Sequence, residues 1–155
     1  MVEMRNARLL NFPDEMSVRQ ARERYFKDNG FGEDGGYSSK WVPLKFGWLT
    51  FYLYNSKARR RAVPLHDLHH IATGYDTDPA GEAEVAIWEL AAGTYDKWFA
   101  LLINLPALVY GYLLWPSRAF AAWRRGRMGH SLYQREFDED LLHLTVGELR
   151  AMTRV

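Results

Sequence analysis

The sequence predicts an all-α protein that folds as a compact single-domain helical bundle. Helix-start signals recur along the chain, an uncharged apolar run is long enough for a complete helix, and β-prone residues are concentrated in one short stretch. A chain of 155 residues is expected to form one domain, here residues 1–155, with a buried core. A short extended segment is expected near 41–54, but a single hairpin does not make a sheet protein. Residues 1–16 are expected to form an irregular N-terminal arm.

Capping residues mark where each predicted helix begins. Ser17 and Thr145 each open a capping box, in which a Gln or Glu follows three residues later. Asp78 precedes Pro79, which is the usual order of a cap and a first helical residue. The predicted helix starts lie at Ser17, Ser56, Asp78, Pro116 and Thr145. Gly30 is suited to end the first helix, because glycine adopts the left-handed closing conformation readily.

The composition excludes several kinds of site. The chain has no cysteine, which excludes disulfides, thiolate zinc sites, iron–sulfur clusters and cysteine nucleophiles. Its 20 Lys and Arg residues balance 19 Asp and Glu residues, so no overall field favours nucleic acid. Aromatic residues make up 15% of the chain, which favours an apolar ligand or an interface. Residues 1–10 resemble neither a signal peptide nor a presequence, so we expect a cytoplasmic location in a bacterium.

The densest group of metal-capable residues is the run His-Asp-Leu-His-His that begins at His66. On a helix, His66 and His70 stack on one face about 5–6 Å apart. Asp67 lies about 100° round the helix and can lean into the same site. Segment 71–81 contains turn residues, so a second helix can direct Glu82 back at the histidines. Two imidazoles and two carboxylates would then bind a divalent cation, with zinc preferred and manganese as the alternative.

Two further residues lie close to this site in the sequence. His69 lies between the paired histidines and can support them without binding the metal. Glu89 shares a helix face with Glu82, and three alternatives remain for it: a further ligand, a supporting acid behind the ligands, or a surface acid. A histidine pair near acidic residues also occurs on solvated helices that bind no metal. Apolar residues flank this motif, however, and a buried histidine–carboxylate cluster is costly unless it is paired or metal-bound. His130 and His143 stand alone, and both are predicted to be structural or exposed.

An uncharged stretch, WFALLINLPALVYGYLLW, occupies residues 98–115. Its length is close to the ~18 residues that suggest a membrane span, but Asn104, Pro106 and Gly111 argue against one. A core helix, a core helix that also lines a lipid channel and a true span remain as alternatives. In the channel alternative, a lipid tail would contact Trp98, Leu102, Leu105, Val109 and Leu113.

A basic cluster follows the apolar stretch. Its arginines are suited to contact acidic lipid headgroups, which predicts a protein peripheral to the inner face of the membrane. The four residues are Arg118, Arg124, Arg125 and Arg127.

The pattern His-Asp-x-x-His, then eleven residues, then Glu resembles the signature of the coenzyme Q biosynthesis protein 4 family, which serves ubiquinone synthesis. In this chain it runs from His66 to Glu82 and includes the Gly-Glu pair that the family also shows. Trp88-Glu89 falls where the family carries an aromatic-Glu pair. The similarity covers about residues 17–152 and is strongest over 58–92.

The resemblance implies a metal-dependent lyase or oxidative decarboxylase that removes the ring carboxylate of a polyprenylated quinone precursor. It also implies an organising role for other quinone-biosynthesis enzymes at the membrane. The alternative is a non-catalytic prenyl-lipid-binding or scaffold protein in which the metal is structural. A metal-dependent phosphohydrolase of the His-Asp type is less favoured, because its separate upstream His and downstream Asp are not found. No residue is assigned a catalytic role, and a homodimer is left open.

Overall fold

The computed structural model describes residues 10–46, 49–93 and 98–155, with side chains described outside 42–49, 51, 53 and 94–103. Within these residues the fold is all-α apart from one two-stranded hairpin. The elements in chain order are α1 (Val18–Asn29), β1 (Trp41–Phe46), β2 (Leu49–Tyr54), α2 (Lys57–Thr73), α3 (Pro79–Ala91), α4 (Trp98–Leu114), α5 (Pro116–Gly126), the 3₁₀ turns η1 (Leu132–Gln134) and η2 (Glu139–His143), and α6 (Val146–Thr153).

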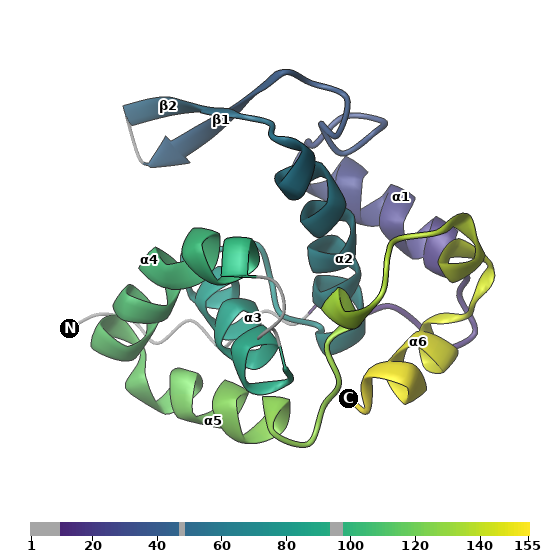
Figure 1. Ribbon diagram of the computed structural model, residues 1–155. Helices are drawn as coiled ribbons and strands as arrows, with labels where there is room; N and C mark the ends of the chain where they lie inside the picture. Colours follow the sequence, from purple (N-terminus) through teal and green to yellow (C-terminus); the bar gives the residue numbers. More distant parts are fainter. Residues whose placement is uncertain (1–9, 47–48, 94–97) are drawn as a thin grey trace.

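The helices form two groups that meet at α2 (Figure 1). In the first group α1 and α6 pack against α2, and the buried cluster between them includes Val18, Leu68 and Leu149. In the second group α3 packs against both α4 and α5, around a buried cluster that includes Ile87 and Trp88. Because α2 also contacts α3 and α4, its motif face lies where the two groups adjoin.

The helix boundaries follow the capping signals of the sequence. Both predicted capping boxes form: the Ser17 side chain accepts from the Gln20 N–H, and Thr145 and Glu148 are paired in the same way. Ser56 caps α2, and α5 begins at Pro116. At Ser17, Ser56 and Thr145 the cap side chain accepts from one free N–H group of the first helical turn, which explains why these boundaries could be predicted. Helix α5 has no such cap, and its start is marked by Pro116 alone.

The expected extended segment at 41–54 is an antiparallel hairpin. Its register runs from Trp41 opposite Tyr54 to Phe46 opposite Leu49. The rings of Trp41 and Tyr54 contact each other edge to face, 5.4 Å between centroids, and both are exposed. The hairpin precedes α2 and projects beyond the helices (Figure 1).

Two glycines allow the neighbouring helices to approach α3 closely. A Cβ atom at Gly111 of α4 would lie 2.8 Å from the Cβ of Ala83, and one at Gly126 of α5 would lie 2.5 Å from the carbonyl oxygen of Trp88. Contacts this short require one of the backbones to move. The glycines therefore fix the position of α3, which carries Glu82 and Glu89.

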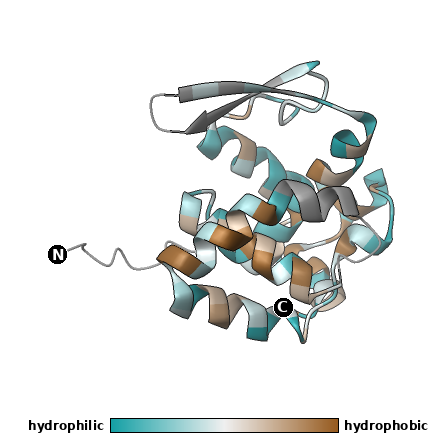
Figure 2. Cartoon of the chain, turned by 60° about the vertical axis from the view of Figure 1, so that its left-hand side comes forward, coloured by the Kyte–Doolittle hydropathy of each residue, from teal (hydrophilic) through white to brown (hydrophobic). Residues whose placement is uncertain are grey.

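The outer face of α4 carries hydrophobic residues that no other described element covers (Figure 2). In the described part of the chain, no helix is long and apolar enough to cross a membrane. Leu105, Val109 and Leu113 follow one another at intervals of four residues and are 48%, 53% and 75% exposed. Among the described residues nothing covers this stripe, which is the kind of exposed apolar surface that often marks an interaction site.

We predict that Leu149→Ala destabilises the metal-free protein by about 2–5 kcal/mol, because Leu149 is fully buried and its truncation leaves a cavity. Leu113→Ala makes the same chemical change at an exposed site of α4 and should alter stability by no more than about 0.5 kcal/mol. Urea unfolding followed by circular dichroism measures both free energies. A large loss of stability for Leu113→Ala would show that its side chain is covered in the folded protein.

Candidate metal centre

A tight turn between α2 and α3 brings the two halves of the motif together. Gly74 ends α2 with a left-handed φ of 80°, and the Asp78 side chain accepts a hydrogen bond from the Gly81 N–H at the start of α3. A Cβ atom at Gly81 would lie 2.0 Å from the carbonyl oxygen of Asp76. Only glycine fits there, so the turn packs directly on the first turn of α3 and places Glu82 opposite the histidines.

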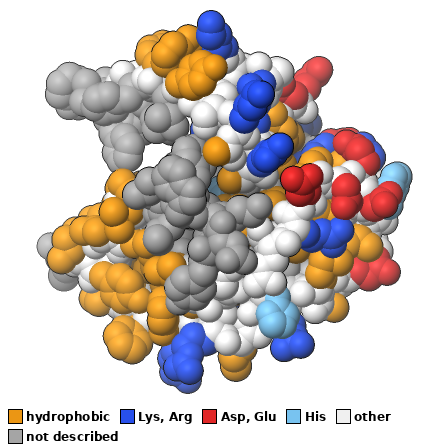
Figure 3. All heavy atoms as spheres, viewed as in Figure 1, with side chains coloured by type: hydrophobic (Ala, Val, Ile, Leu, Met, Phe, Trp, Pro, Cys, Tyr) orange, Lys and Arg blue, Asp and Glu red, His pale blue; other side chains and the backbone are white. Residues whose placement is uncertain are grey.

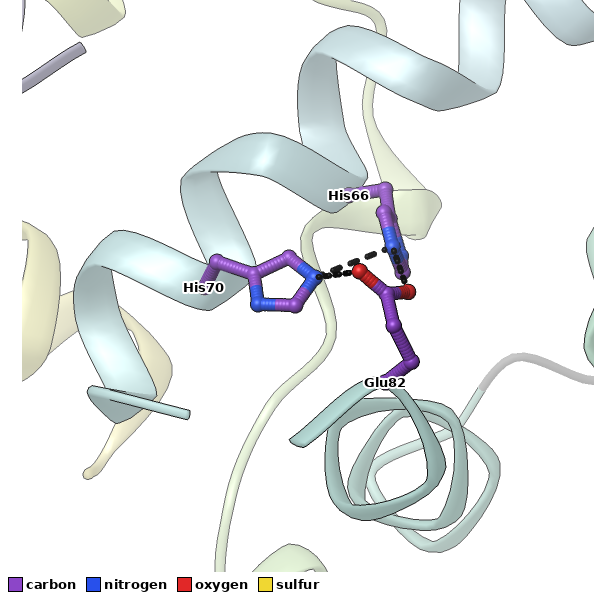
Figure 4. Close-up of side chains that lie close together, drawn as sticks. All are labelled: His66, His70 and Glu82. Carbon is purple, nitrogen blue, oxygen red and sulfur yellow. Dashed lines mark hydrogen bonds and ion pairs between the residues drawn. The ribbon is translucent and has the colours of Figure 1, made fainter. Parts of the chain in front are cut away.

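His66 and His70 of α2 and Glu82 of α3 point toward one another (Figure 4). The two Nε2 atoms are 3.2 Å apart, and the Glu82 oxygens lie 3.5 Å from Nε2 of His66 and 3.4 Å from Nε2 of His70. Two ligands bound tetrahedrally to zinc at ~2.0–2.1 Å are themselves ~3.3 Å apart. The three residues therefore have the separations that a bound divalent cation requires, and they form a group that could hold a metal ion.

The Nδ1 atoms of both histidines face acceptors. Nδ1 of His66 lies 2.8 Å from Oε1 of Glu89, and Nδ1 of His70 lies 2.9 Å from the carbonyl oxygen of Tyr75. A carboxylate and a carbonyl only accept hydrogen bonds, so in the neutral rings the protons sit on Nδ1. Both Nε2 lone pairs are then directed at the same point, an arrangement that a proton or a metal cation stabilises.

Charge on the cluster is shared between imidazoles and carboxylates. Burial raises the pKa of Glu82, but the neighbouring His70 and His66 outweigh it and lower the pKa to about 2. Burial lowers the pKa of His66, but Glu89 and Glu82 together outweigh it and raise that pKa well above its usual value. Glu82 is therefore a carboxylate at neutral pH, as a ligand must be.

The centre is accessible from the side of Glu82. The Glu82 and His66 side chains are 37% and 19% exposed, whereas the His70 side chain is fully buried. The aromatic ring of Tyr25, from α1, stacks on His70 with 5.7 Å between ring centroids. The site thus has a rigid inner wall and an outer side that a ligand can reach.

Glu89 and His69 lie directly behind the centre. Glu89 is fully buried and accepts hydrogen bonds from His66, from His69 at 2.7 Å and from the Tyr133 hydroxyl at 3.1 Å. Burial raises the pKa of Glu89, but His66 and His69 outweigh it and keep the group ionised. His69 is fully buried between Trp88 and Tyr133, at ring distances of 5.2 and 5.0 Å.

Asp67 is not part of the converging group of ligand atoms. Its buried carboxylate accepts a hydrogen bond from the hydroxyl of Tyr37, in the loop that precedes the hairpin. Burial raises the pKa of Asp67, although the nearby His66 and the Tyr37 hydrogen bond oppose this rise. The structure thus brings Glu82, rather than Asp67, to the two Nε2 atoms.

Sequence reasoning missed several residues that shape the site. Two of them contact the motif: Tyr25 of α1 stacks on His70, and Tyr37, in the loop before the hairpin, donates to Asp67. The other two, Asn104 of α4 and Tyr133 of η1, donate to Glu89. Tyr133 is 44 residues from Glu89 along the chain. No local periodicity links positions so far apart, so only the tertiary fold identifies them.

The predicted lipid-contact residues are divided between described and undescribed positions. The side chains of Trp98 and Leu102 lie outside the described residues. Leu105, Val109 and Leu113 form the exposed stripe of α4, and hydrophobic side chains gather over α4 and α5 in the surface view (Figure 3). The stripe faces the surface, so a channel through the protein along it is not seen in the described part.

The four predicted headgroup arginines differ in their surroundings. Arg118 forms an ion pair with Glu84, 2.5 Å between Nη2 and Oε2, and Arg125 donates to the carbonyl oxygen of Thr73 at 2.7 Å. Arg124 and Arg127 are exposed on α5 and just after it. Arg124 and Arg127 are therefore better placed than Arg118 and Arg125 to contact a negatively charged surface.

Comparisons of the chain with models of protein families, with curated proteins and with solved structures give no match.

We predict that His70→Ala lowers the affinity for zinc by more than about 100-fold. Loss of a ligand should exceed the 10–100-fold effect that is usual when a supporting partner is removed. His143→Ala should leave the affinity unchanged, because His143 is exposed in η2 and is not part of the converging group. Competition with a chromogenic chelator measures the affinity, and circular dichroism verifies that each variant is folded. Equal affinities of the two variants would contradict the assignment.

Proposed function

We propose that this protein binds a divalent metal ion and handles a polyprenylated aromatic acid in quinone biosynthesis, in the manner of the coenzyme Q biosynthesis protein 4 family that it resembles. The convergence of His66, His70 and Glu82 at metal-ligand separations is the observation that carries this proposal. Two imidazoles and one carboxylate are also the ligand set of several catalytic zinc sites, which keep a further position open for substrate. Zinc is the preferred ion and manganese the alternative.

The proposed substrate has a polar ring and an apolar tail, and the surroundings of the site suit both. A divalent cation supplies Lewis acidity to a ring carboxylate or phenolic oxygen and stabilises developing negative charge. Glu82 and His66 are partly exposed, so a ring can approach them from outside. The chemistry that we assign to the centre is oxidative removal of the ring carboxylate with dioxygen as the oxidant. A 4-hydroxybenzoic acid and one O2 would give the quinone, carbon dioxide and one water, so the ring carbon that loses the carboxylate takes up oxygen.

The apolar stripe of α4 supports the lipid part of this proposal. Gly111 holds α4 against Ala83, the residue after Glu82, so the stripe and the metal centre lie on adjoining helices. A helix that is hydrophobic all round has to be buried in protein or in lipid. We assign the exposed side of α4 to the membrane interface, from which a prenylated substrate can reach the centre with its tail still in lipid.

Basic residues on and just after α5, the helix that packs against α4, support the same orientation. Arg124 and Arg127 are exposed, and each basic residue near an anionic membrane contributes roughly 1 kcal/mol to binding. Phe120, on the same helix as Arg124, is also exposed. An apolar surface beside basic residues is typical of a protein that lies on a membrane without crossing it.

The substrate assignment predicts that the zinc-loaded protein binds a prenylated 4-hydroxybenzoate at least about 10-fold more tightly than the unprenylated acid, since each buried methylene contributes about 0.8 kcal/mol. Glu82→Gln should weaken binding of both acids, because the ring binds at the metal. Isothermal titration calorimetry measures affinity, and mass spectrometry of reactions in air-saturated buffer detects loss of the carboxylate. Two results together would favour the lipid-binding scaffold instead. The prenylated acid would bind equally tightly to the wild type and to Glu82→Gln, and its ring carboxylate would not be lost.

The membrane assignment predicts flotation of the protein with anionic vesicles at low salt and release at high salt, because salt screens the arginines. Val109→Glu should reduce flotation strongly by placing a charge in the apolar stripe. Met152→Glu makes the same change at an exposed position of α6 and should float like the wild type. Equal flotation of both variants would exclude α4 as the contact surface, and failure of the wild type to float would exclude membrane contact.

A further inference from the structure

One metal ligand, His66, is held from behind by a charged residue. The Nδ1 atom of His66 donates to Oε1 of Glu89 over 2.8 Å, whereas His70 donates to a backbone carbonyl. Nδ1 and Nε2 lie on opposite sides of the imidazole, so a partner at Nδ1 determines where Nε2 points and which nitrogen carries the proton. The backbone carbonyl at His70 cannot be replaced by mutation of a side chain, but Glu89 can.

Glu89 is itself fixed by donors from three elements. The Asn104 amide of α4 donates to its Oε2 over 2.6 Å, and the Tyr133 hydroxyl of η1 donates to its Oε1 over 3.1 Å. His69 of α2 donates to the same Oε1 over 2.7 Å. A carboxylate that is fully buried and hydrogen-bonded in this way has little freedom to rotate, so its Oε1 is a fixed acceptor.

The proton on His69 can be assigned from its second contact. The backbone N–H of Leu132 donates to Nε2 of His69 over 2.9 Å, so this nitrogen carries no proton when the ring is neutral. The proton is then on Nδ1, where it is donated to Glu89. His69 thus has both nitrogens occupied by protein groups and cannot bind the metal without losing the Leu132 contact. Its role in the motif is to hold Glu89.

We infer that Glu89 is a positioning residue of the metal centre, which fixes the orientation of His66 and keeps its proton on Nδ1. This inference rests on the proposed metal-binding function of His66, His70 and Glu82. The opposite tautomer would place an N–H on Nε2, 3.2 Å from Nε2 of His70, and would remove the lone pair that binds the cation. Partners that orient ligand histidines in this way typically contribute 10–100-fold to metal affinity.

The substitutions Glu89→Met and Glu89→Gln separate positioning from packing. Methionine has a similar length but offers no comparable acceptor to His66, and it should lower zinc affinity by 10–100-fold. Glutamine retains a carbonyl oxygen that can accept from His66, and its amide can donate to Asn104 once that side chain is rotated. Glu89→Gln should therefore restore most of the affinity. Glu84→Met is the matched control, since Glu84 is a buried acid of the same helix whose partner is Arg118.

The tautomer is measured on the metal-free protein at an alkaline pH above the raised pKa of His66, where its ring is neutral, by correlating ring nitrogens with ring protons in NMR spectra. We expect Nδ1–H for His66 in the wild type and in Glu89→Gln, and an appreciable Nε2–H population in Glu89→Met. The wild-type spectrum tests the inference even where Glu89→Met does not fold. An Nε2–H tautomer in the wild type would overturn it.

Zinc titrations distinguish this inference from the proposed function. Tight zinc binding by the wild type together with equal affinity of folded Glu89→Met would overturn the positioning role alone. The absence of zinc binding by the wild type would overturn the metal-binding function itself. Equal losses in Glu84→Met and Glu89→Met would assign the effect to general loss of a buried acid, and the positioning role would again be overturned.

Discussion

The arrangement of the helices around the candidate metal centre depends on the hydrogen bonds that the buried carboxylate of Glu89 accepts. Burying a charge is costly unless the charge is paired and hydrogen-bonded. Its donors come from α2, α4 and η1, so the carboxylate is satisfied only after these elements have assembled around α3. The polar network therefore specifies one packing of the second helix group against α2, which hydrophobic contacts alone define less sharply.

The same network fixes the orientation of the His66 and His70 rings. Protons on the Nδ1 atoms of His66 and His70 are committed to acceptors in the interior, so the Nε2 atoms face outward to Glu82. Two lone pairs 3.2 Å apart are unfavourable by themselves, and the carboxylate of Glu82 makes a positive charge at this point favourable. The packing of the core thus holds two imidazole nitrogens at a point where a positive charge is favourable.

Features of the site that depend on residues close together in the sequence could be predicted. Contacts between residues far apart in the sequence could not. The histidine pair, the caps at Ser56 and Asp78 and the return of Glu82 depend on helical spacing and a short turn, so the sequence predicted them. Asp67 lies on the same helix as His66 and His70, but its carboxylate accepts a hydrogen bond from Tyr37, which lies in a loop 30 residues earlier. That loop is positioned by tertiary packing, and no spacing within the motif indicates it. The donors to Glu89 from α4 and η1 escaped prediction for the same reason.

Helix α4 combines the two kinds of surface that the proposed substrate needs. Its inner side carries three residues at helical spacing. Asn104 donates a hydrogen bond to Glu89, Leu108 belongs to the buried cluster, and Gly111 lies against Ala83. Its outer side carries Leu105, Val109 and Leu113, which α3 cannot reach because it packs on the opposite face. An apolar face of this kind is costly in water, and contact with lipid removes the cost. Such a helix beside a pair of histidines that could hold a metal ion is the combination on which the proposal of a ligand with a polar head and a long apolar tail rests.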